Sequence, residues 1–321
     1  MKVRRAVATV CRLFAGIALS LSIPAAARAA EGGGLFDYDT KVPLGLVEKG
    51  VERGPGVIVR DITFDGLTGR PLAAYVVSPE TPGPHAGVLF VHWLGEPETT
   101  NRTQFLAEAK DLAARGVVSV LVDAMWSTAV NPEWYSKRVP EADRANSIRQ
   151  VVALRRAMDL LLSQKGVDPA RVAVVGHDYG GMYSMLMNGV DRRAKAAVYI
   201  AVVPSLNDWA FFGPQPKSKA DYVRENADLE LTDALRAAKN SNVLLQFGTK
   251  DIYVARADTG VVAAAAGTRN RRFYDDEHAM TLPQIRVDRA AFLAERLALP
   301  AAPAAPAGTP KGDGRGEEAL R

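Results

Sequence analysis

An apolar run at residues 173–175 is followed by Gly-His-Asp-Tyr-Gly-Gly at residues 176–181, and this stretch restricts the possible folds more than any other part of the sequence. An apolar run of this kind predicts a strand that is buried on both faces, and residues 182–188 are compatible with a helix. The glycines of the turn allow neighbouring chains to approach more closely than a Cβ would permit. The stretch therefore predicts a strand, a sharp turn and a helix, with Asp178 at the mouth of the helix.

Three interpretations of this turn compete. Aspartate is a favoured N-cap residue and glycine-rich turns follow strands in many α/β proteins, so Asp178 can be a plain helix cap. A dinucleotide-binding fingerprint requires Gly-x-Gly-x-x-Gly, which His177 and Tyr179 interrupt. The third interpretation is a nucleophile elbow, whose central side chain attacks the substrate. Serine or cysteine usually occupies that central position, and Asp178 occupies it here.

Predicted strands and helices alternate along residues 55–299. Residues 57–64 and 72–78, separated by a glycine-containing turn, predict an antiparallel hairpin. Further strands are predicted at 86–92, 117–122, 172–175, 196–203, 243–248 and 271–274, and helices at 100–115, 148–166, 229–239, 254–266 and 285–299. This order predicts an α/β fold: a mostly parallel sheet of about eight strands, with helices on both faces and no large cap domain. Catalytic groups in such sheets lie at the carboxyl ends of the strands.

The residues before this domain predict export. Residues 1–29 combine a basic start, an apolar stretch and a small-residue cleavage site, Ala27-Arg28-Ala29, which is the pattern of a signal peptide. The apolar stretch is too short to predict a membrane span. We therefore expect a periplasmic or secreted protein that is not held in a membrane after cleavage. The single cysteine, Cys11, lies in this segment, so the mature chain would contain no disulfide and no thiol nucleophile.

Charge and composition exclude other classes of protein. The formal net charge of the whole chain is +4, and removal of the five basic residues in 1–29, which has no acidic residue, leaves −1. No basic face remains that would predict nucleic-acid binding. Residues 30–54 are predicted as an N-terminal segment, 204–228 as a short lid-like excursion, and 300–321 as a disordered tail rich in proline and alanine. The sequence predicts neither a metal ion nor a cofactor, and it specifies no oligomeric state.

Two polar residues follow later strands of the predicted sheet. Asp251 comes after strand 243–248, where a carboxylate can orient a histidine, although a Lys-Asp pair is also ordinary turn chemistry. His278 comes after the last strand, and it is the only one of the four histidines in that loop. Histidine suits general-base catalysis near neutral pH. The chain order Asp178, Asp251, His278 therefore predicts a catalytic triad of nucleophile position, acid and base.

Taken together, these residues resemble the α/β-hydrolase superfamily over residues 55–299. The resemblance rests on His92-Trp93 after a strand, the turn around Asp178, Gly248-x-x-Asp251 and His278. The body is most similar to the dienelactone-hydrolase branch, because it has no long cap insertion and a similar Tyr-x-x-x-His-Ala ending. The turn itself resembles that of epoxide hydrolases and haloalkane dehalogenases, which carry Gly-His-Asp-Trp-Gly-Gly or close variants.

The resemblance also implies roles for residues around the turn. It implies an oxyanion hole formed by the backbone N–H of Leu94, or alternatively of Trp93, together with that of Tyr179. Dehalogenases use a tryptophan after the nucleophile as a halide donor, and this chain has Tyr179 there. Aromatic residues of the excursion suggest an apolar substrate wall and a tyrosine proton donor, with plain packing as the alternative. The candidate substrate-binding residues are Trp93, Trp209, Phe212 and Tyr222.

An aspartate at the nucleophile position determines which chemistry is available. Aspartate is ionised at neutral pH without help from a base, so Asp178 could attack an sp³ carbon and form an alkyl-enzyme ester. His278, oriented by Asp251, would then activate the water that hydrolyses this ester. Epoxides and alkyl halides suit this route, whereas an ester or lactone would require Asp178 to act as a base on water.

The sequence thus predicts an exported hydrolase that acts on a small, largely apolar substrate, with the bond undecided between an ester or lactone and an epoxide. The opposing class is a non-catalytic binding protein in which the change to aspartate disabled an ancestral esterase. The intact Asp251–His278 pair argues against that class, because a general base has no function in a non-catalytic binding protein.

Overall fold

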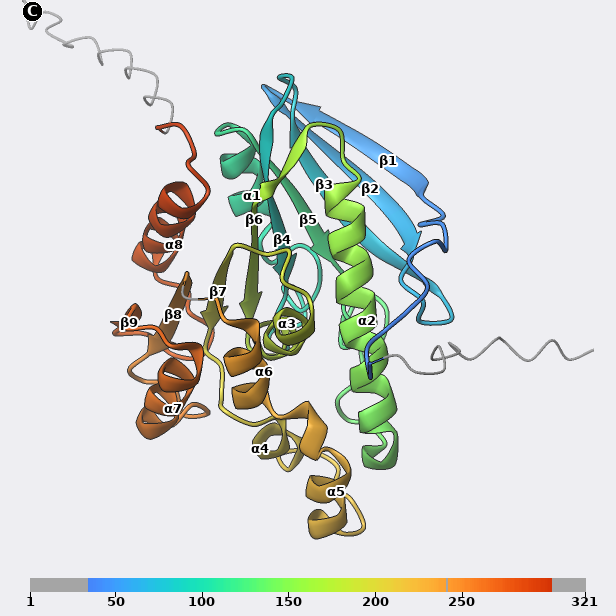
Figure 1. Cartoon of the computed structure of the whole chain (residues 1–321), viewed down its shortest axis with the longest axis vertical. Helices are drawn as coiled ribbons and strands as arrows, with labels where there is room; N and C mark the ends of the chain where they lie inside the picture. The colour runs from blue at the N-terminus through green and yellow to red at the C-terminus, as the bar shows by residue number, and fades with distance from the viewer. Residues whose placement is uncertain (1–33, 241, 302–321) are drawn as a thin grey trace, which may run out of the picture.

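The computed structural model describes residues 34–240 and 242–301. Their strands form one sheet in the order β1-β2-β3-β5-β4-β6-β7-β8-β9 (Figure 1). The strands are β1 (Val47–Gly54), β2 (Val57–Asp65), β3 (Pro71–Pro79), β4 (His85–Val91), β5 (Val117–Val122), β6 (Val167–His177), β7 (Ala196–Ile200), β8 (Val243–Gly248) and β9 (Arg271–Tyr274). Strands β2 and β4 to β9 run in one direction, and β1 and β3 run in the other. The predicted mostly parallel α/β sheet, with a hairpin at its start, is confirmed.

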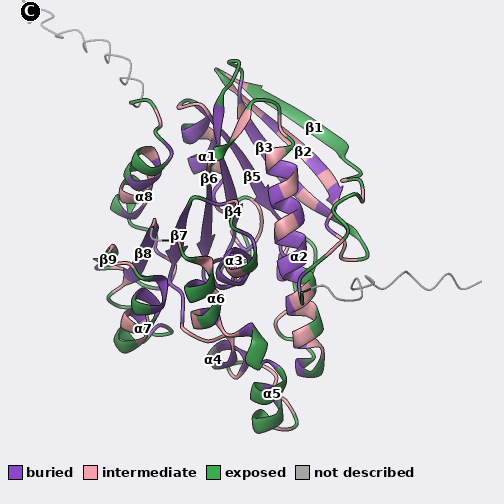
Figure 2. Cartoon of the chain, viewed as in Figure 1, coloured by how far each residue is buried: buried purple, intermediate pink, exposed green. Residues whose placement is uncertain are grey.

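Helices cover both faces of the sheet, because the side chains of the central strands alternate between two hydrophobic cores. The helices are α1 (Leu106–Ala113), α2 (Asp143–Leu162), α3 (Tyr179–Val190), α4 (Leu206–Ala210), α5 (Lys219–Glu225), α6 (Leu231–Ala238), α7 (Arg256–Ala266) and α8 (Pro283–Arg296). One core lies under α2, α3, α6 and α7, and the other lies under α1 and α8. In β4, Leu89 and Val91 enter the first core, and Val88 and Phe90 enter the second. Burial on both faces (Figure 2) explains why the central strands are continuous apolar runs.

Strand β1 was not predicted from the sequence, and it extends the sheet from about eight strands to nine. It lies within the predicted N-terminal segment, residues 30–54, and pairs with β2 from Val47 opposite Thr63 to Gly54 opposite Val57. Its residues are exposed along nearly the whole strand (Figure 2). An edge strand without a buried face carries no alternating apolar pattern, so periodicity alone cannot identify it.

The predicted signal peptide, residues 1–29, lies outside the described residues, as does the predicted tail except for residues 300 and 301. Within the part of the chain that is described, no helix combines the length and the apolar composition needed to cross a bilayer. Export of the protein therefore remains a prediction from the sequence.

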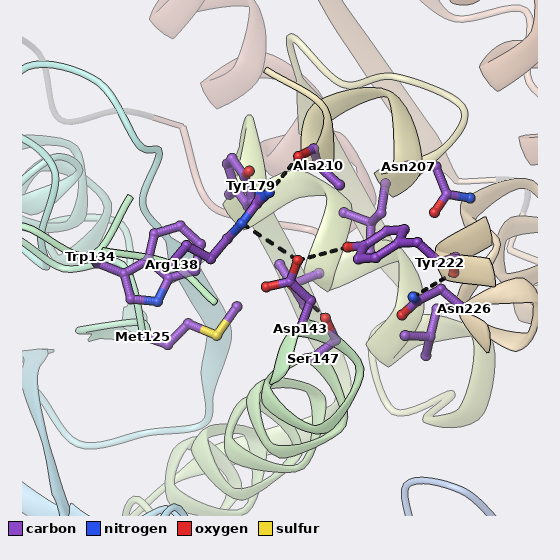
Figure 3. A pocket seen from close by; sticks show the side chains of 13 residues that line it. Met125, Trp134, Arg138, Asp143, Ser147, Tyr179, Asn207, Ala210, Tyr222 and Asn226 are labelled. Carbon is purple, nitrogen blue, oxygen red and sulfur yellow. Dashed lines mark hydrogen bonds and ion pairs between the residues drawn. The ribbon is translucent and has the colours of Figure 1, made fainter. Parts of the chain in front are cut away.

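The excursion between β7 and α6 contains the short helices α4 and α5, and it is anchored on the residues around the start of α2 (Figure 3). The buried Arg138 guanidinium donates to the backbone carbonyls of Ala210 and Pro214, the latter at 3.0 Å. Asp143 is the first residue of α2. Its Oδ2 accepts a hydrogen bond from the Tyr222 hydroxyl at 2.8 Å and lies 3.5 Å from Arg138 Nε. Buried hydrogen bonds to charged groups are costly to break, so these contacts hold the excursion against the body of the domain.

Candidate active site

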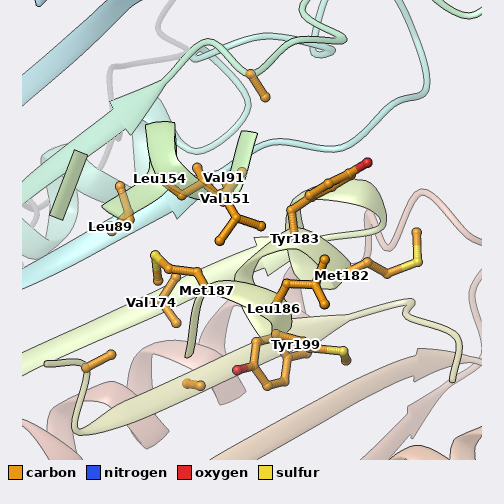
Figure 4. Packing of buried hydrophobic residues seen from close by; sticks show 14 of the residues in the cluster. Leu89, Val91, Val151, Leu154, Val174, Met182, Tyr183, Leu186, Met187 and Tyr199 are labelled. Carbon is orange, nitrogen blue, oxygen red and sulfur yellow. The ribbon is translucent and has the colours of Figure 1, made fainter. Parts of the chain in front are cut away.

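Asp178 occupies the sharp turn between β6 and α3, two elements that are packed into the core. The inward face of α3, including Met182 and Leu186, lies among side chains of β4, β6 and α2 (Figure 4). Asp178 itself has φ 53° and ψ −121°, a backbone conformation that is costly for any residue with a side chain. The strand, turn and helix expected from the sequence are present, and the strained residue is the one at the central position.

Two glycines make this strained turn possible. A Cβ on Gly180 would lie 2.2 Å from the carbonyl oxygen of Val91, and a Cβ on Gly176 would lie 2.4 Å from the carbonyl oxygen of Gly180. These separations are shorter than real Cβ contacts, so β4, β6 and α3 can meet only because both residues lack a side chain. This close approach brings the end of β4 beside Asp178.

The structure brings together the three residues of the predicted triad, each from beyond the end of a different strand. His278 Nδ1 donates to Asp251 Oδ2 at 2.8 Å, and His278 Nε2 lies 3.6 Å from Asp178 Oδ1. The side chains of Asp178 and Asp251 are fully buried, and His278 is 8% exposed. The imidazole therefore lies between two buried carboxylates, one at each ring nitrogen.

The two carboxylate oxygens of Asp178 have different surroundings. Oδ2 accepts a hydrogen bond from the backbone N–H of Leu94 at 3.0 Å, whereas Oδ1 is buried without a hydrogen-bond partner among the described residues. The alternative oxyanion donor, the amide of Trp93, is already bonded to Gln104 Oε1 at 2.9 Å, which leaves Leu94 as the donor. The Tyr179 amide belongs to the first turn of α3, where N–H groups have no acceptor within the helix.

The two carboxylates determine the charge of His278. Burial lowers the pKa of His278, but the nearby Asp178 carboxylate and the hydrogen-bonded Asp251 carboxylate outweigh burial and raise this pKa to about 9. His278 is therefore protonated at neutral pH in the resting site, and a protonated imidazole cannot accept another proton. It becomes a base only when one of the two neighbouring negative charges is removed.

His177, which the sequence analysis did not select as a site residue, holds the backbone of His278 in place. Its Nε2 donates to the carbonyl oxygen of His278 at 2.9 Å, and its Nδ1 accepts from Gln104 Nε2 at 2.7 Å. Burial and the neighbouring charge of His278 keep the pKa of His177 well below its ordinary value, so the ring stays neutral. The ring also stacks on Trp93, with centroids 4.9 Å apart. Its place beside Asp178 is the only sequence signal for this role.

A cavity of about 630 Å³ opens beside His278, and three of the four candidate substrate-binding residues line it: Trp93, Trp209 and Phe212. Trp209 packs against the His278 ring, with centroids 5.4 Å apart. The fourth candidate, Tyr222, was wrongly placed, because it lines a separate cavity of about 30 Å³ (Figure 3). The Tyr222 hydroxyl donates a hydrogen bond to the buried Asp143 carboxylate. Tyr222 therefore helps to hold the excursion against the domain and does not contact the reacting groups.

Two tyrosines that the sequence analysis did not select line the larger cavity instead, Tyr135 and Tyr253. Tyr253 packs edge-on against the His278 ring, with centroids 5.1 Å apart, and neither hydroxyl has a hydrogen-bond partner within the described residues. Burial raises the pKa of Tyr135, Arg138 opposes the rise and Asp178 adds to it. The two hydroxyls are therefore the candidate proton donors that the resemblance assigned to Tyr222.

Comparison with known proteins agrees with this architecture. Residues 103–275, more than half of the chain, match the prolyl oligopeptidase family. No match among curated proteins was found.

Solved structures are similar to this chain at low sequence identity. The acetyl xylan esterase from Paenibacillus sp. R4 is 18% identical with a TM-score of 0.62, and the match covers 79% of this chain and 90% of that one. A structure assigned as a dienelactone hydrolase from Klebsiella pneumoniae subsp. pneumoniae MGH 78578 is 16% identical with a TM-score of 0.57, covering 76% of this chain and 99% of that one. These likenesses confirm the α/β-hydrolase fold with a dienelactone-hydrolase-like body.

Proposed function

The chain belongs to the prolyl oligopeptidase family and is a hydrolase of the α/β-hydrolase fold, and we propose that it cleaves a largely apolar substrate through a covalent ester on Asp178. In this proposal Asp178 is the nucleophile, His278 is the base, and Asp251 orients His278. The preferred electrophile is an sp³ carbon bonded to oxygen, as in an epoxide, because a carboxylate that attacks such a carbon forms a stable ester.

The observation that carries this proposal is the asymmetry of the Asp178 carboxylate. Oδ2 is held by the Leu94 amide at 3.0 Å, while Oδ1 accepts no hydrogen bond from the described residues and lies 3.6 Å from His278 Nε2, its partner in an ion pair. An attacking oxygen needs a free lone pair, and the oxygen that becomes the ester carbonyl needs a donor that stabilises it as an oxyanion. A plain helix cap would instead accept a hydrogen bond from the helix backbone, and the Asp178 side chain accepts none from α3.

In the first step, Oδ1 attacks the carbon, the carbon–oxygen bond of the substrate breaks, and the leaving oxygen takes a proton from Tyr135 or Tyr253. The product of this step is a neutral ester on Asp178. His278 then keeps only one charged partner, Asp251, so its pKa falls and its proton passes to the tyrosinate. Neutral His278 is now able to act as a base.

In the second step, His278 takes a proton from a water molecule whose oxygen attacks the carbonyl carbon of the ester. The Leu94 amide, already bonded to Oδ2, stabilises the resulting oxyanion together with the Tyr179 amide. Collapse of the intermediate breaks the bond between the carbonyl carbon and Oδ1, and the remaining proton of the attacking water passes to this leaving oxygen. The alcohol departs, and the Asp178 carboxylate is restored beside a protonated His278. One water molecule is consumed and no net proton is gained or lost by the site.

An ester or lactone is the second candidate substrate, and the comparisons favour it because the similar structures include an acetyl xylan esterase. Attack of Asp178 on an acyl carbon would give a reactive anhydride. In this route Asp178 would instead take a proton from the water that attacks the substrate, and no substrate atom would be bonded to the enzyme.

A single turnover in ¹⁸O-labelled water distinguishes the two routes. The substrate is chosen by screening wild type against p-nitrophenyl esters, lactones, aryl epoxides and haloalkanes. With enzyme in excess, the covalent route places the label in the Asp178 carboxylate, detected by mass spectrometry of the peptide that contains it, and leaves the first product unlabelled. Label found directly in the product contradicts the covalent ester and favours Asp178 as a base.

We also propose that the protein is exported, on the basis of the signal-peptide pattern in residues 1–29. N-terminal sequencing of protein recovered from the periplasm or the culture fluid should begin near Ala30. Protein in those fractions that still begins at Met1 contradicts the proposal.

A further inference from the structure

The cavity beside His278 opens onto a rim of exposed apolar side chains. Ile252 is 85% exposed, Phe212 60% and Tyr253 45%, and all three line the cavity. Ile252 is the most exposed of the large hydrophobic residues in the described chain. A single exposed apolar side chain is ordinary, whereas several that gather at one opening mark a binding surface.

This apolar rim is continuous with the reacting groups. Tyr253 packs against His278 with ring centroids 5.1 Å apart and against Phe212 at 6.1 Å. Trp209 contacts both rings, at 5.7 Å from Tyr253 and 5.6 Å from Phe212. A path of aromatic contacts therefore runs from His278 to the exposed edge of the cavity, where Ile252 is the neighbour of Tyr253 in the chain. One ligand can occupy this path from His278 to the solvent.

We propose that the substrate carries an extended alkyl arm, which leaves the cavity across the rim formed by Phe212, Ile252 and Tyr253. This proposal rests on the proposed function, because it places the reacting carbon at Asp178 and the arm beyond it. The volume of about 630 Å³ falls in the range of pockets that hold drug-sized ligands, roughly 300–1,000 Å³. A compact epoxide would leave most of the aromatic wall and the whole rim without a contact.

The charged residues of the cavity do not favour an alkyl arm. Glu96, Lys250 and Glu277 also line the cavity, and an alkyl chain gains nothing from contact with them. The rim residues therefore determine how the affinity depends on chain length. Phe212 comes from the excursion, whereas Ile252 and Tyr253 follow β8, so the arm would also bridge two segments that are distant in sequence.

The test compares chain-length series on wild type and on Ile252→Ser. Straight-chain terminal epoxides from butyl to dodecyl report kcat/KM, and the corresponding 1,2-diols, which cannot react, report binding by titration calorimetry. Each added methylene should raise kcat/KM and diol affinity about fourfold until the chain passes the rim. Ile252→Ser should lose about tenfold with the longest chains and less than twofold with the shortest.

Val287→Ser is the matched control, because Val287 is 57% exposed on α8 and does not line the cavity. It should leave the whole series unchanged. Diol affinity of wild type that does not rise with chain length overturns the proposal, whatever the epoxides do. Chain-length-dependent diol binding without any epoxide turnover supports the arm and contradicts the proposed chemistry instead. A rate of epoxide hydrolysis that rises only above the critical micelle concentration of the substrate would mean that the rim binds a lipid surface, and it would overturn the proposal.

Discussion

Replacing His278 by glutamine should let the enzyme form the ester on Asp178 and should stop its hydrolysis, so that protein carrying the mass of one substrate accumulates. Attack by Oδ1 needs no base, because the carboxylate is already the nucleophile. Hydrolysis needs the base that takes a proton from water, and a base of this kind contributes about 10²–10⁴-fold to the rate. Intact-protein mass spectrometry should show the adduct, and peptide mapping should place it on Asp178.

Asp178→Asn is the control for this trap, since its amide presents no free carboxylate oxygen to the substrate. It should show no adduct and should lower kcat/KM by about 10⁴-fold. Absence of an adduct in His278→Gln, together with a loss of activity equal to that of Asp178→Asn, would mean that both residues act in one step. The ester or lactone route, with Asp178 as a base, would then be preferred.

The folded protein should lose stability as the pH rises from about 6.5 to about 9, because of His278. The pKa of His278 is about 9 in the folded state, and an unfolded histidine has a pKa of about 6.5. Below about pH 6.5 both states bind the proton and the stabilisation is complete; above that value only the folded state keeps it, until it too releases the proton near pH 9. The loss of unfolding free energy over this interval amounts to roughly 3 kcal/mol.

Urea unfolding at both ends of this pH interval measures the loss, and NMR titration of the imidazole locates its midpoint. Burial lowers the pKa of His92 to about 4, so His92 should show no change in the same spectra. In Asp178→Asn the His278 midpoint should move down, because one of the two carboxylates is gone, as in the ester. A midpoint that stays near 9 in this variant contradicts the mechanism in which ester formation turns His278 into a base.

The predictable part of the fold is the part that depends on local sequence. The buried strands are apolar runs, the strained turn needs Gly176 and Gly180, and both signals are visible along the chain without knowledge of any partner. Parallel strands end at the same edge of a sheet. The sequence order of Asp178, Asp251 and His278, each after a strand, was therefore enough to predict that these three side chains would meet.

Other features depended on contacts between distant segments. Strand β1 forms because β2 offers it a free edge, and its own exposed residues carry no apolar period. The sequence left two candidates for the oxyanion donor, the Leu94 and Trp93 amides. The Trp93 amide donates its hydrogen bond to Gln104, so the Leu94 amide is the one that donates to Asp178. Tyr222 does not line the larger cavity, because its hydroxyl donates a hydrogen bond to the buried Asp143.

The fold class, the aspartate at the central position and the order of the residues that could react all follow from the local sequence. Which oxygen of Asp178 accepts no hydrogen bond from the described residues, which tyrosines line the cavity and what charge His278 carries depend on the folded arrangement. Each of these depends on burial and on the distance between groups from separate elements. The free energies involved arise from desolvation and from paired charges, and neither exists until the chain has folded.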